Sequence, residues 1–389
     1  MSSAVSGATN LISVSLPKCT QITQSAFYHC TSLKSAILPK VVSTLGKCSF
    51  DGCTSLSIFS APLVSSANGY ALRNCPLKTL YMPALTGWST SNPLTSVTTL
   101  ESVTTGHEAI PAWSAHWPNL KYYSNSNATT ITAAAFSGCT NLKAANFHAP
   151  NLTAIAQSAF RNGGFDYANS AIFPNVTGTI GAYAFYQCAS LSSVNLPGVT
   201  SLAAGVFKGC TTLKYVKLAA LTSLAVNSNH STFADCPALQ SIYLTNYTAP
   251  IVRYTFYSNT ALTTVSIPKA TQINSYAFHH CTALRTISLP AVTTIQANAF
   301  SGATALSSVD IGTTAATKVT IAAQAFINLA SLSTLKIRYT SLASLANVNA
   351  FTGTGITSTT GSIYVPNAWL ASYKAATNWK TFSARMIGF

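Results

Sequence analysis

The sequence predicts a repeat solenoid of the α/β type, dominated by short β-strands, in which one small unit is stacked on itself. A phrase close to A-F-x-x-C-T-x-L-x-x-V-x-L-P-x-V-T-x-I recurs along nearly the whole chain. Clear copies begin at Ala26, Ala184 and Ala277. A fixed period in this range is typical of solenoids, whose units cannot bury their apolar faces alone. Function is therefore expected on the faces of the stack.

Each copy has an anchor at its Phe position, and the steps between anchors within a run are 22 to 26 residues. The anchors are Phe27, Phe50, Leu72, Phe136, Phe160, Phe185, Phe207, Phe233, Phe256, Phe278, Phe300, Phe326 and Phe351. The step from Leu72 to Phe136 is 64 residues, which leaves room for two degenerate copies. The motif nearly dissolves over about residues 84–135, so irregular repeats are expected there.

The segment L-x-x-V-x-L in each copy alternates apolar and polar residues, as a half-buried strand does. The proline that follows cannot donate to the next ladder bond, so it ends the strand. We expect the anchor Phe to fill the interior between the strand and the returning chain. Stacked copies then form a parallel sheet with strands about 4.8 Å apart.

These motifs resemble the leucine-rich repeat of BspA-like bacterial surface proteins, over roughly residues 8–365. The residues that carry the resemblance are the A-F-x-x-C, T-x-L and L-P elements, as in Ala26-Phe27, Cys30, Leu33 and Leu38-Pro39. The resemblance implies a leucine-rich repeat solenoid with a concave parallel sheet, and roles in adhesion to host proteins, glycans or other cells.

The C-terminal part differs from the repeats, so we divide the chain into a solenoid over residues 1–365 and a capping segment over residues 366–389. Residues 367–375 predict a short helix, with Asn367 as its N-cap. Trp369, Tyr373 and Trp379 are suited to cover the open end of the last coil, since terminal repeats need such a lid. The N-terminus has no comparable lid, which is consistent with truncation or with self-association through this end.

Composition points to an extracellular or cell-surface protein with anionic partners. Only 7% of the residues are charged, and the net charge is +15. A basic surface favours partners such as acidic glycans, whereas isolated lysines can also simply keep the protein soluble. The N-terminus has no pattern of a signal peptide. Membrane insertion is not expected, because no apolar run is long enough to cross a bilayer.

The cysteines are predicted to be packing residues. Eight of the ten share one repeat position: Cys30, Cys53, Cys75, Cys139, Cys188, Cys210, Cys236 and Cys281. Other copies have Ala303 or Leu329 there, and free Cys behaves as a small buried hydrophobe. The alternative is a disulfide between stacked neighbours such as Cys30, Cys53 and Cys75, which could come near bridging distance. We expect no cofactor, no metal site and no enzyme. A Cys-His dyad at His280-Cys281 is the alternative, but an inward thiol is inert.

Partner binding is expected on the outward positions of the sheet and in the irregular repeats. The sheet offers many hydroxyls with scattered Tyr and Lys, which suits glycans or proteins, although Ser and Thr are also simply tolerated in strands. The irregular repeats are rich in aromatic residues, which are favoured at interaction hot spots. The alternative there is that large aromatics fill a poorly matched core. The candidate residues are Trp88, Trp113, Trp117, Tyr122, Tyr215, Lys217 and Tyr243.

A row of basic residues follows the repeat leucine in several copies. At a shared phase they would line one rim of the sheet, and their wide spacing suits weak multivalent attraction to polyanions. No nucleic-acid module accompanies them, so nucleic acid is not an expected partner. This basic rim consists of Lys34, Lys78, Lys121, Lys143, Lys214 and Arg285.

Together these features predict a non-enzymatic extracellular binding or adhesion protein, with proteins or acidic glycans of a cell surface or matrix as its partners. Two alternatives stay open at this point. The chain could be a structural spacer of a larger surface protein, or a host-binding fibre component of a bacterial virus.

Overall fold

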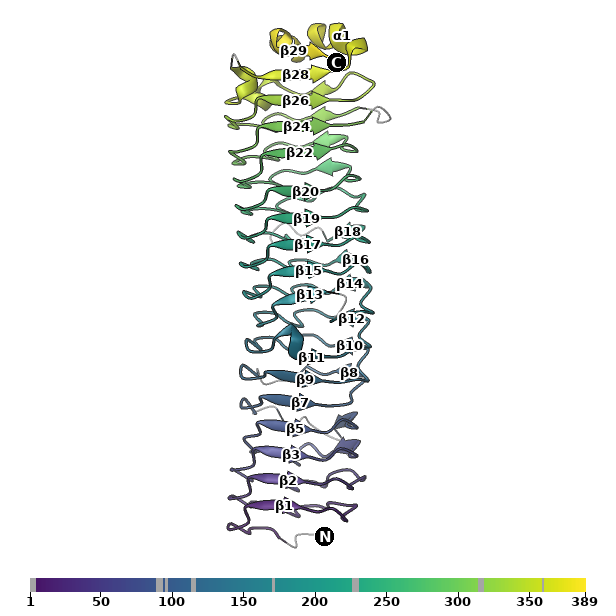
Figure 1. Ribbon diagram of the computed structural model, residues 1–389, viewed down its shortest axis with the longest axis vertical. Coiled ribbons are helices and arrows are strands. Elements are labelled where there is room, and N and C mark those ends of the chain that lie inside the picture. Colours follow the sequence, from purple (N-terminus) through teal and green to yellow (C-terminus); the bar gives the residue numbers. More distant parts are fainter. Residues whose placement is uncertain are drawn as a thin grey trace. The chain divides into compact units, whose positions relative to one another are not determined.

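The computed structural model describes residues 5–88, 94, 97–112, 117–169, 172–225, 231–313, 318–358 and 360–389. The chain divides into two compact units, Met1–Val176 and Thr177–Phe389. Within each unit, successive copies of the motif form successive coils, whose strands lie one above the next (Figure 1). The predicted parallel β-solenoid is therefore confirmed within each unit.

Unit 1 has a main parallel sheet and short strands on a second side of the coil. The main sheet runs in the order β1 (Ser13–Ser15), β2 (Ser35–Ile37), β3 (Ile58–Ser60), β5 (Thr79–Tyr81), β7 (Ser102–Thr104), β9 (Tyr122–Ser124) and β11 (Phe147–His148). The second side has β4 (Ser66–Ala67) with β6 (Gly87–Trp88), and β8 (Ala109–Ile110), β10 (Thr130–Ile131) and β12 (Ala154–Ile155). A 3-10 turn, η1 (Ala144–Asn146), precedes β11, and β13 (Tyr167–Asn169) follows β12.

Unit 2 repeats this plan. Its main-sheet strands are β15 (Ser193–Asn195), β17 (Tyr215–Lys217), β19 (Ser241–Tyr243) and β20 (Thr264–Ser266), then β22 (Thr286–Leu289), β24 (Ser308–Ile311), β26 (Thr334–Ile337), β28 (Ser362–Val365) and β29 (Met386–Gly388). The second side has β14 (Gly178–Ile180), β16 (Val199–Leu202) and β18 (Ser223–Leu224), then β21 (Gln272–Ile273), β23 (Thr294–Ile295), β25 (Thr320–Ile321) and β27 (Ser344–Leu345).

The irregular stretch keeps the strand register of its neighbours. Thr79 on β5 pairs with Ser102 on β7, and Ser102 pairs with Tyr122 on β9. The inward residues Val103 and Tyr123 are each 1% exposed. Each of the two degenerate copies therefore contributes a strand in register to the main sheet.

The anchor residues form a column of rings through the core of unit 2. Consecutive rings from Phe185 to Phe351 lie 5.0 to 5.9 Å apart, with interplanar angles of 3° to 25°. All of these side chains are 0% exposed. Burial of a large apolar side chain at each coil is the main stabilising term of the stack.

A left-handed backbone residue follows every anchor by two positions. All of these residues have φ between 53° and 77°, where Gly and Asn are favoured and bulky residues are strained. They are His29, Gly52, Asn74, Gly138, Asn162, Gln187, Gly209, Asp235, Ser258, His280, Gly302, Asn328 and Gly353. This conformation turns the chain from the anchor into the next strand, and it explains the Gly-Cys and Asn-Cys corners of the motif.

The C-terminal segment packs on the last coil of unit 2, where α1 (Leu370–Ala375) lies beside β29 (Figure 1). The 3-10 elements of this region are η2 (Val348–Phe351), η3 (Gly355–Thr357), η4 (Asn367–Trp369) and η5 (Trp379–Arg385). Trp379 and Phe382 meet the end of the ring column at Phe351, with ring centroids 6.2 and 5.3 Å away. The predicted N-cap is wrong, because α1 begins only at Leu370 and Asn367 opens η4 instead.

Candidate functional site

The main sheet of unit 2 brings three of the predicted binding residues together. Lys217 on β17 pairs in register with Tyr243 on β19, and Tyr215 pairs with Ser241. The rings of Tyr215 and Tyr243 lie 5.6 Å apart with a 42° angle between their planes. Tyr215 and Lys217 are exposed and Tyr243 is half-buried. The result is an outward patch of two tyrosines and one cation on adjacent strands.

Among the described residues, hydroxyl groups on the strands beside this patch make no side-chain hydrogen bond, in contrast to several hydroxyls outside the main sheet. The turn residues Thr222 and Thr293 donate to the carbonyl oxygens of Thr200 and Thr271 in the preceding coil, at 3.1 and 3.2 Å. Such hydrogen bonds connect one coil to the next, and the hydroxyl hydrogen is then not available to a ligand. On the sheet, Ser241, Thr264, Ser266, Thr286 and Ser288 form no side-chain hydrogen bond within the described ranges. These outward hydroxyls are free to bond a ligand.

Three asparagine side chains also form hydrogen bonds from one coil to the preceding one. Asn151, Asn175 and Asn246 each begin an N-x-T sequence, and each donates to a carbonyl oxygen of the preceding coil, at 2.7 to 3.0 Å. These side chains stabilise the stack of coils. The N-x-T sequences, which match the acceptor pattern for N-glycosylation, therefore have a structural explanation at these positions.

The basic rim of unit 1 contains an acid that the sequence prediction missed. Glu101 follows Leu100 and so occupies the same phase as the lysines. Its carboxylate oxygens lie 3.6 Å from the Lys78 ammonium and 2.9 Å from the Lys121 ammonium. The hydrogen bond from Lys121 lowers the pKa of Glu101. Two of the rim cations are therefore partly neutralised, although exposed pairs of this kind are weak.

The remaining rim residues differ in how free they are. Lys34, Lys214 and Arg285 are exposed. Lys143 is half-buried, and its ammonium donates to the carbonyl oxygen of Gly164 at 3.0 Å. Among the rim residues, Lys34, Lys214 and Arg285 thus present the most accessible charges.

The aromatic candidates of the irregular stretch fall into three groups. Trp117 is 1% exposed and lies three residues before Leu120, where other coils have the cysteine, so it fills the core and cannot touch a partner. Trp88 is half-buried, and its ring lies 6.4 Å from that of His107. Tyr122 is 54% exposed on β9. Trp113 lies outside the described residues.

Burial of His107 makes unit 1 sensitive to acid. The side chain is 5% exposed, and burial lowers the pKa of His107 to about 4. The unfolded chain takes up this proton near its ordinary pKa, so the stability is complete above pH 6.5 and falls as the pH drops toward 4. We expect a slope of up to about 1.4 kcal/mol per pH unit in the free energy of unfolding. For His107→Leu, the free energy of unfolding measured in urea should change less with pH between these values than it does in the wild type. An equal change with pH in both proteins would contradict the assignment.

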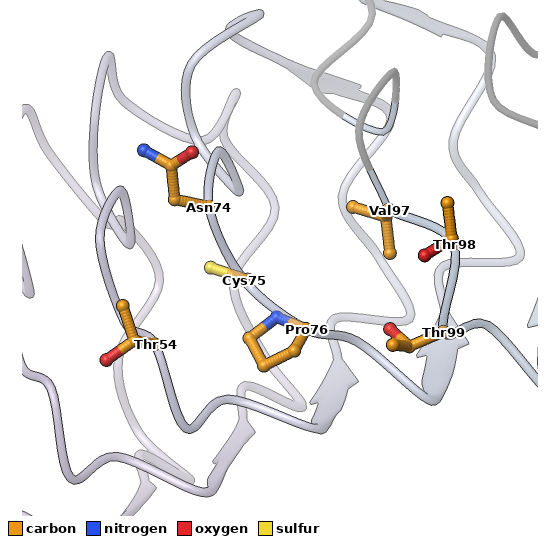
Figure 2. Close-up of a pocket in the computed structure, with 7 residues that line it drawn as sticks. All are labelled: Thr54, Asn74, Cys75, Pro76, Val97, Thr98 and Thr99. Atoms are coloured by element: carbon orange, nitrogen blue, oxygen red, sulfur yellow. The ribbon is translucent and has the colours of Figure 1, made fainter.

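A shallow hollow lies between coils where the irregular stretch, about residues 84–135, begins (Figure 2). It has a volume of about 390 Å³, and its lining comes from three consecutive coils. The lining residues are Thr54, Asn74, Cys75, Pro76, Val97, Thr98 and Thr99. Cys75 is committed to the core, because its thiol donates to the Phe50 carbonyl oxygen at 3.1 Å. The hollow therefore offers hydroxyls and an amide but no charged group.

The cysteines have a common structural role. All ten are free thiols, and the eight at the shared repeat position are buried. Several donate to the carbonyl oxygen of the anchor in the preceding coil, as Cys53 does to Phe27 at 3.1 Å and Cys210 does to Phe185 at 3.0 Å. Burial raises the pKa of Cys139 and of Cys236 to about 12. Such thiols are packed donors and not nucleophiles.

This role predicts the reactivity of each thiol. In the native protein a maleimide should modify only the half-exposed Cys19 and Cys48, because the other eight are buried. The remaining thiols should react only at the rate of unfolding, which mass spectrometry of the labelled peptides can follow. Rapid native labelling of Cys210 or Cys281 would show that the thiol column is open.

The described ranges contain no cluster of three or more His, Cys, Asp or Glu residues that could hold a metal ion. In the same ranges, no helix combines the length and the hydrophobicity needed to span a bilayer.

Comparison with known families agrees with the repeat. A family model described as the BspA type leucine rich repeat region, with six copies, matches residues 2–91, 117–228 and 226–357. The chain belongs to this BspA-type leucine-rich repeat family. The resemblance read from the motif is thus confirmed, and the match spans most of the chain. No curated protein sequence matched.

Several solved structures are similar to this BspA-type protein. One is a leucine-rich repeat protein from Bacteroides ovatus, at 17% identity, with 98% of this chain and 92% of that chain covered and a TM-score of 0.45. Another is a leucine rich cell surface protein from Faecalibacterium prausnitzii, at 22% identity, 77% and 87% coverage and a TM-score of 0.34. The pneumococcal vaccine antigen PcpA follows at 14% identity, 92% and 83% coverage and a TM-score of 0.37.

Proposed function

We propose that the protein is a non-enzymatic binding or adhesion protein of the cell exterior, and that the main sheet of unit 2 is its contact face. The observation that carries this proposal is the patch of Tyr215, Lys217 and Tyr243, surrounded by outward hydroxyls that have no protein partner within the described ranges. Tyr rings supply rigid contact area, and free hydroxyls exchange hydrogen bonds with a polar ligand.

Glycans or proteins of a cell surface or matrix are the partners that this face suits. Acidic glycans are favoured among the glycans, because Lys217 forms no ion pair with any described residue, and Lys214 at the rim is exposed. Attraction of this kind weakens as salt rises. The absence of catalysis belongs to the proposal, and the buried thiols with raised pKa values support it.

Binding to immobilised acidic glycans, neutral glycans and matrix proteins at low and high salt tests the proposal. The double variant Tyr215→Ser, Tyr243→Ser should weaken binding by about tenfold or more, as loss of hot-spot aromatics does. Tyr70→Ser removes an exposed tyrosine from unit 1 and should leave binding unchanged. Binding that survives the double variant would refute this contact face. Absence of binding to every probe would favour the structural spacer.

Self-association through the N-terminal end is a second proposal, supported by the exposure of the first coil. The strand β1 pairs with β2 and with no other described strand. Ile12 is 59% exposed beside it. An apolar residue next to a free strand edge favours pairing with another strand. Sedimentation at rising concentration should show oligomers of the wild type, and the Ile12→Lys variant should stay monomeric. A wild-type monomer at all concentrations would refute this proposal.

A further inference from the structure

A compact group of rings lies on the turns of two adjacent coils in unit 2, away from the main sheet. Tyr254 and Tyr276 lie 5.4 Å apart with nearly parallel planes, and Tyr257 and His279 lie 5.2 Å apart in the same way. Within one coil, the rings of Tyr254 and Tyr257 meet edge-on at 5.6 Å, and within the next coil those of Tyr276 and His279 meet edge-on at 5.5 Å. We call these four residues the aromatic quartet. All four are half-buried, so part of each ring reaches solvent.

Two exposed side chains flank the aromatic quartet. The Arg253 guanidinium lies 4.6 Å from the Tyr254 ring centre and 5.3 Å from that of Tyr276, and it donates to the Tyr254 hydroxyl at 2.8 Å. These contacts hold the guanidinium in place. On the other flank, the His280 ring lies 4.1 Å from that of His279. The turn-face patch consists of the quartet with Arg253 and His280.

The repeat does not require aromatic residues at these positions. Tyr254 and Tyr276 have φ values of 60° and 59°, in the left-handed region that disfavours bulky side chains. The next two coils have Asn298 and Gln324 at the same phase and with the same conformation. The turns of those coils form without rings. The tyrosines therefore cost conformational energy that the fold does not need, and strain of this kind concentrates at functional sites.

The turn-face patch is complementary to a carboxylate. Arg253 is exposed and forms no ion pair with any described carboxylate. Its planar fork can bond a carboxylate through two N–H groups, and its stacking on Tyr254 already fixes the geometry. Asp235 is close in sequence, but it contacts the Lys208 ammonium at 3.5 Å.

The arrangement of charge favours a protein segment over an acidic polysaccharide. A polysaccharide with repeated carboxylates would meet repeated cations along the coils, but the positions equivalent to Arg253 in the following coils are Ser275, Ala297 and Ala323. The cation is therefore a single point within an aromatic cluster. Tyr and Arg at the centre of a contact are typical of hot spots between proteins.

We propose that the turn-face patch is a second docking surface, which binds a segment of another protein that carries carboxylate side chains next to an apolar group. The proposal does not depend on the sheet face, because the patch lies on the turns and shares no residue with it. A carboxylate pairs with Arg253, and the apolar group rests against the quartet.

An array of synthetic peptides tests this docking surface. Each peptide has one aromatic residue flanked by Asp or Glu, and each has a twin with Asn or Gln instead. We expect the full chain to bind acidic peptides at least about tenfold more tightly than their twins. Arg253→Gln and Tyr276→Asn should each reduce that binding by a similar factor. Tyr70→Ser, which removes an exposed tyrosine of unit 1 that belongs to neither surface, should leave it unchanged.

Thermal unfolding separates a docking role from a structural one. Asn tolerates the left-handed conformation, so Tyr276→Asn should keep or raise the midpoint of unfolding while binding is lost. Three results would overturn the proposal. They are equal binding of acidic peptides and twins, a Tyr276→Asn variant that is destabilised but binds normally, and Arg253-dependent binding of polygalacturonate in place of the peptides.

Discussion

Replacing Phe256 by Ala is expected to destabilise unit 2 by about 3–5 kcal/mol, the range for truncation of a buried aromatic residue. The ring of Phe256 lies 5.9 Å from that of Phe233 and 5.0 Å from that of Phe278, and it is 0% exposed. Its removal leaves a cavity in the middle of the column. The neighbouring backbone is fixed by bonds between coils, such as that from the Phe256 amide to the Ala277 carbonyl oxygen, so the cavity cannot collapse.

Denaturant unfolding followed by far-UV circular dichroism measures this loss. Phe256→Leu is the matched control, because Leu72 occupies the anchor position in unit 1 and is also 0% exposed. Leucine refills most of the space, so we expect a loss of only about 1–2 kcal/mol. Equal stability of the alanine variant and the wild type would mean that the column does not hold the coils together.

Replacing Trp379 by Ala should have an effect of similar size, about 3–5 kcal/mol. Trp379 is 1% exposed, and its indole N–H donates to the Ala343 carbonyl oxygen at 2.7 Å. The ring also contacts Tyr373, with a centroid distance of 5.4 Å. Without the indole, the end of the ring column at Phe351 loses part of its cover, and a buried carbonyl loses its donor.

The same denaturation measurement, with Trp369→Ala as control, tests the role of the lid. Trp369 belongs to the same segment but is half-buried. Its replacement should cost less than about 1 kcal/mol, as is usual away from the core. If the two tryptophan variants were equally stable, the segment after residue 366 would be an appendage and not a cap.

The features that repeat could be predicted from the sequence, because stacking places equivalent residues in equivalent surroundings. The inward direction of Phe185, Phe207 and Phe278, the parallel register and the buried thiols all follow from the period alone. The period could also have predicted that Trp117 is buried, because the spacing from Trp117 to Leu120 equals that from Cys139 to Leu142. That spacing places Trp117 in the core.

Features that depend on differences between adjacent coils were not predicted. The ion pairs of Glu101 need Lys78 and Lys121 in the coils on both sides, and only the rim phase connects them. The turn-face patch likewise joins residues 22 positions apart, such as Tyr254 and Tyr276. Its sequence signal is a pair of tyrosines in adjacent coils at a phase where the next two coils have Asn298 and Gln324. The left-handed conformation that makes this substitution informative becomes visible only in the structure.

Distances between spin labels in unit 1 test most directly the claim that successive coils lie in register. Ser13 and Tyr122 share one outward column of the main sheet, at opposite ends of the series β1, β2, β3, β5, β7 and β9. Labels can replace these two residues in a protein that has Cys19→Ser and Cys48→Ser, since the other thiols are buried.

Five strand steps predict a narrow distribution of backbone distances centred near about 24 Å, and labels at Ser35 and Tyr122 should shorten it by one step of about 4.8 Å. A broad distribution, or a distance that does not change with the number of strands between the labels, would contradict the stacked coils on which every proposed surface depends.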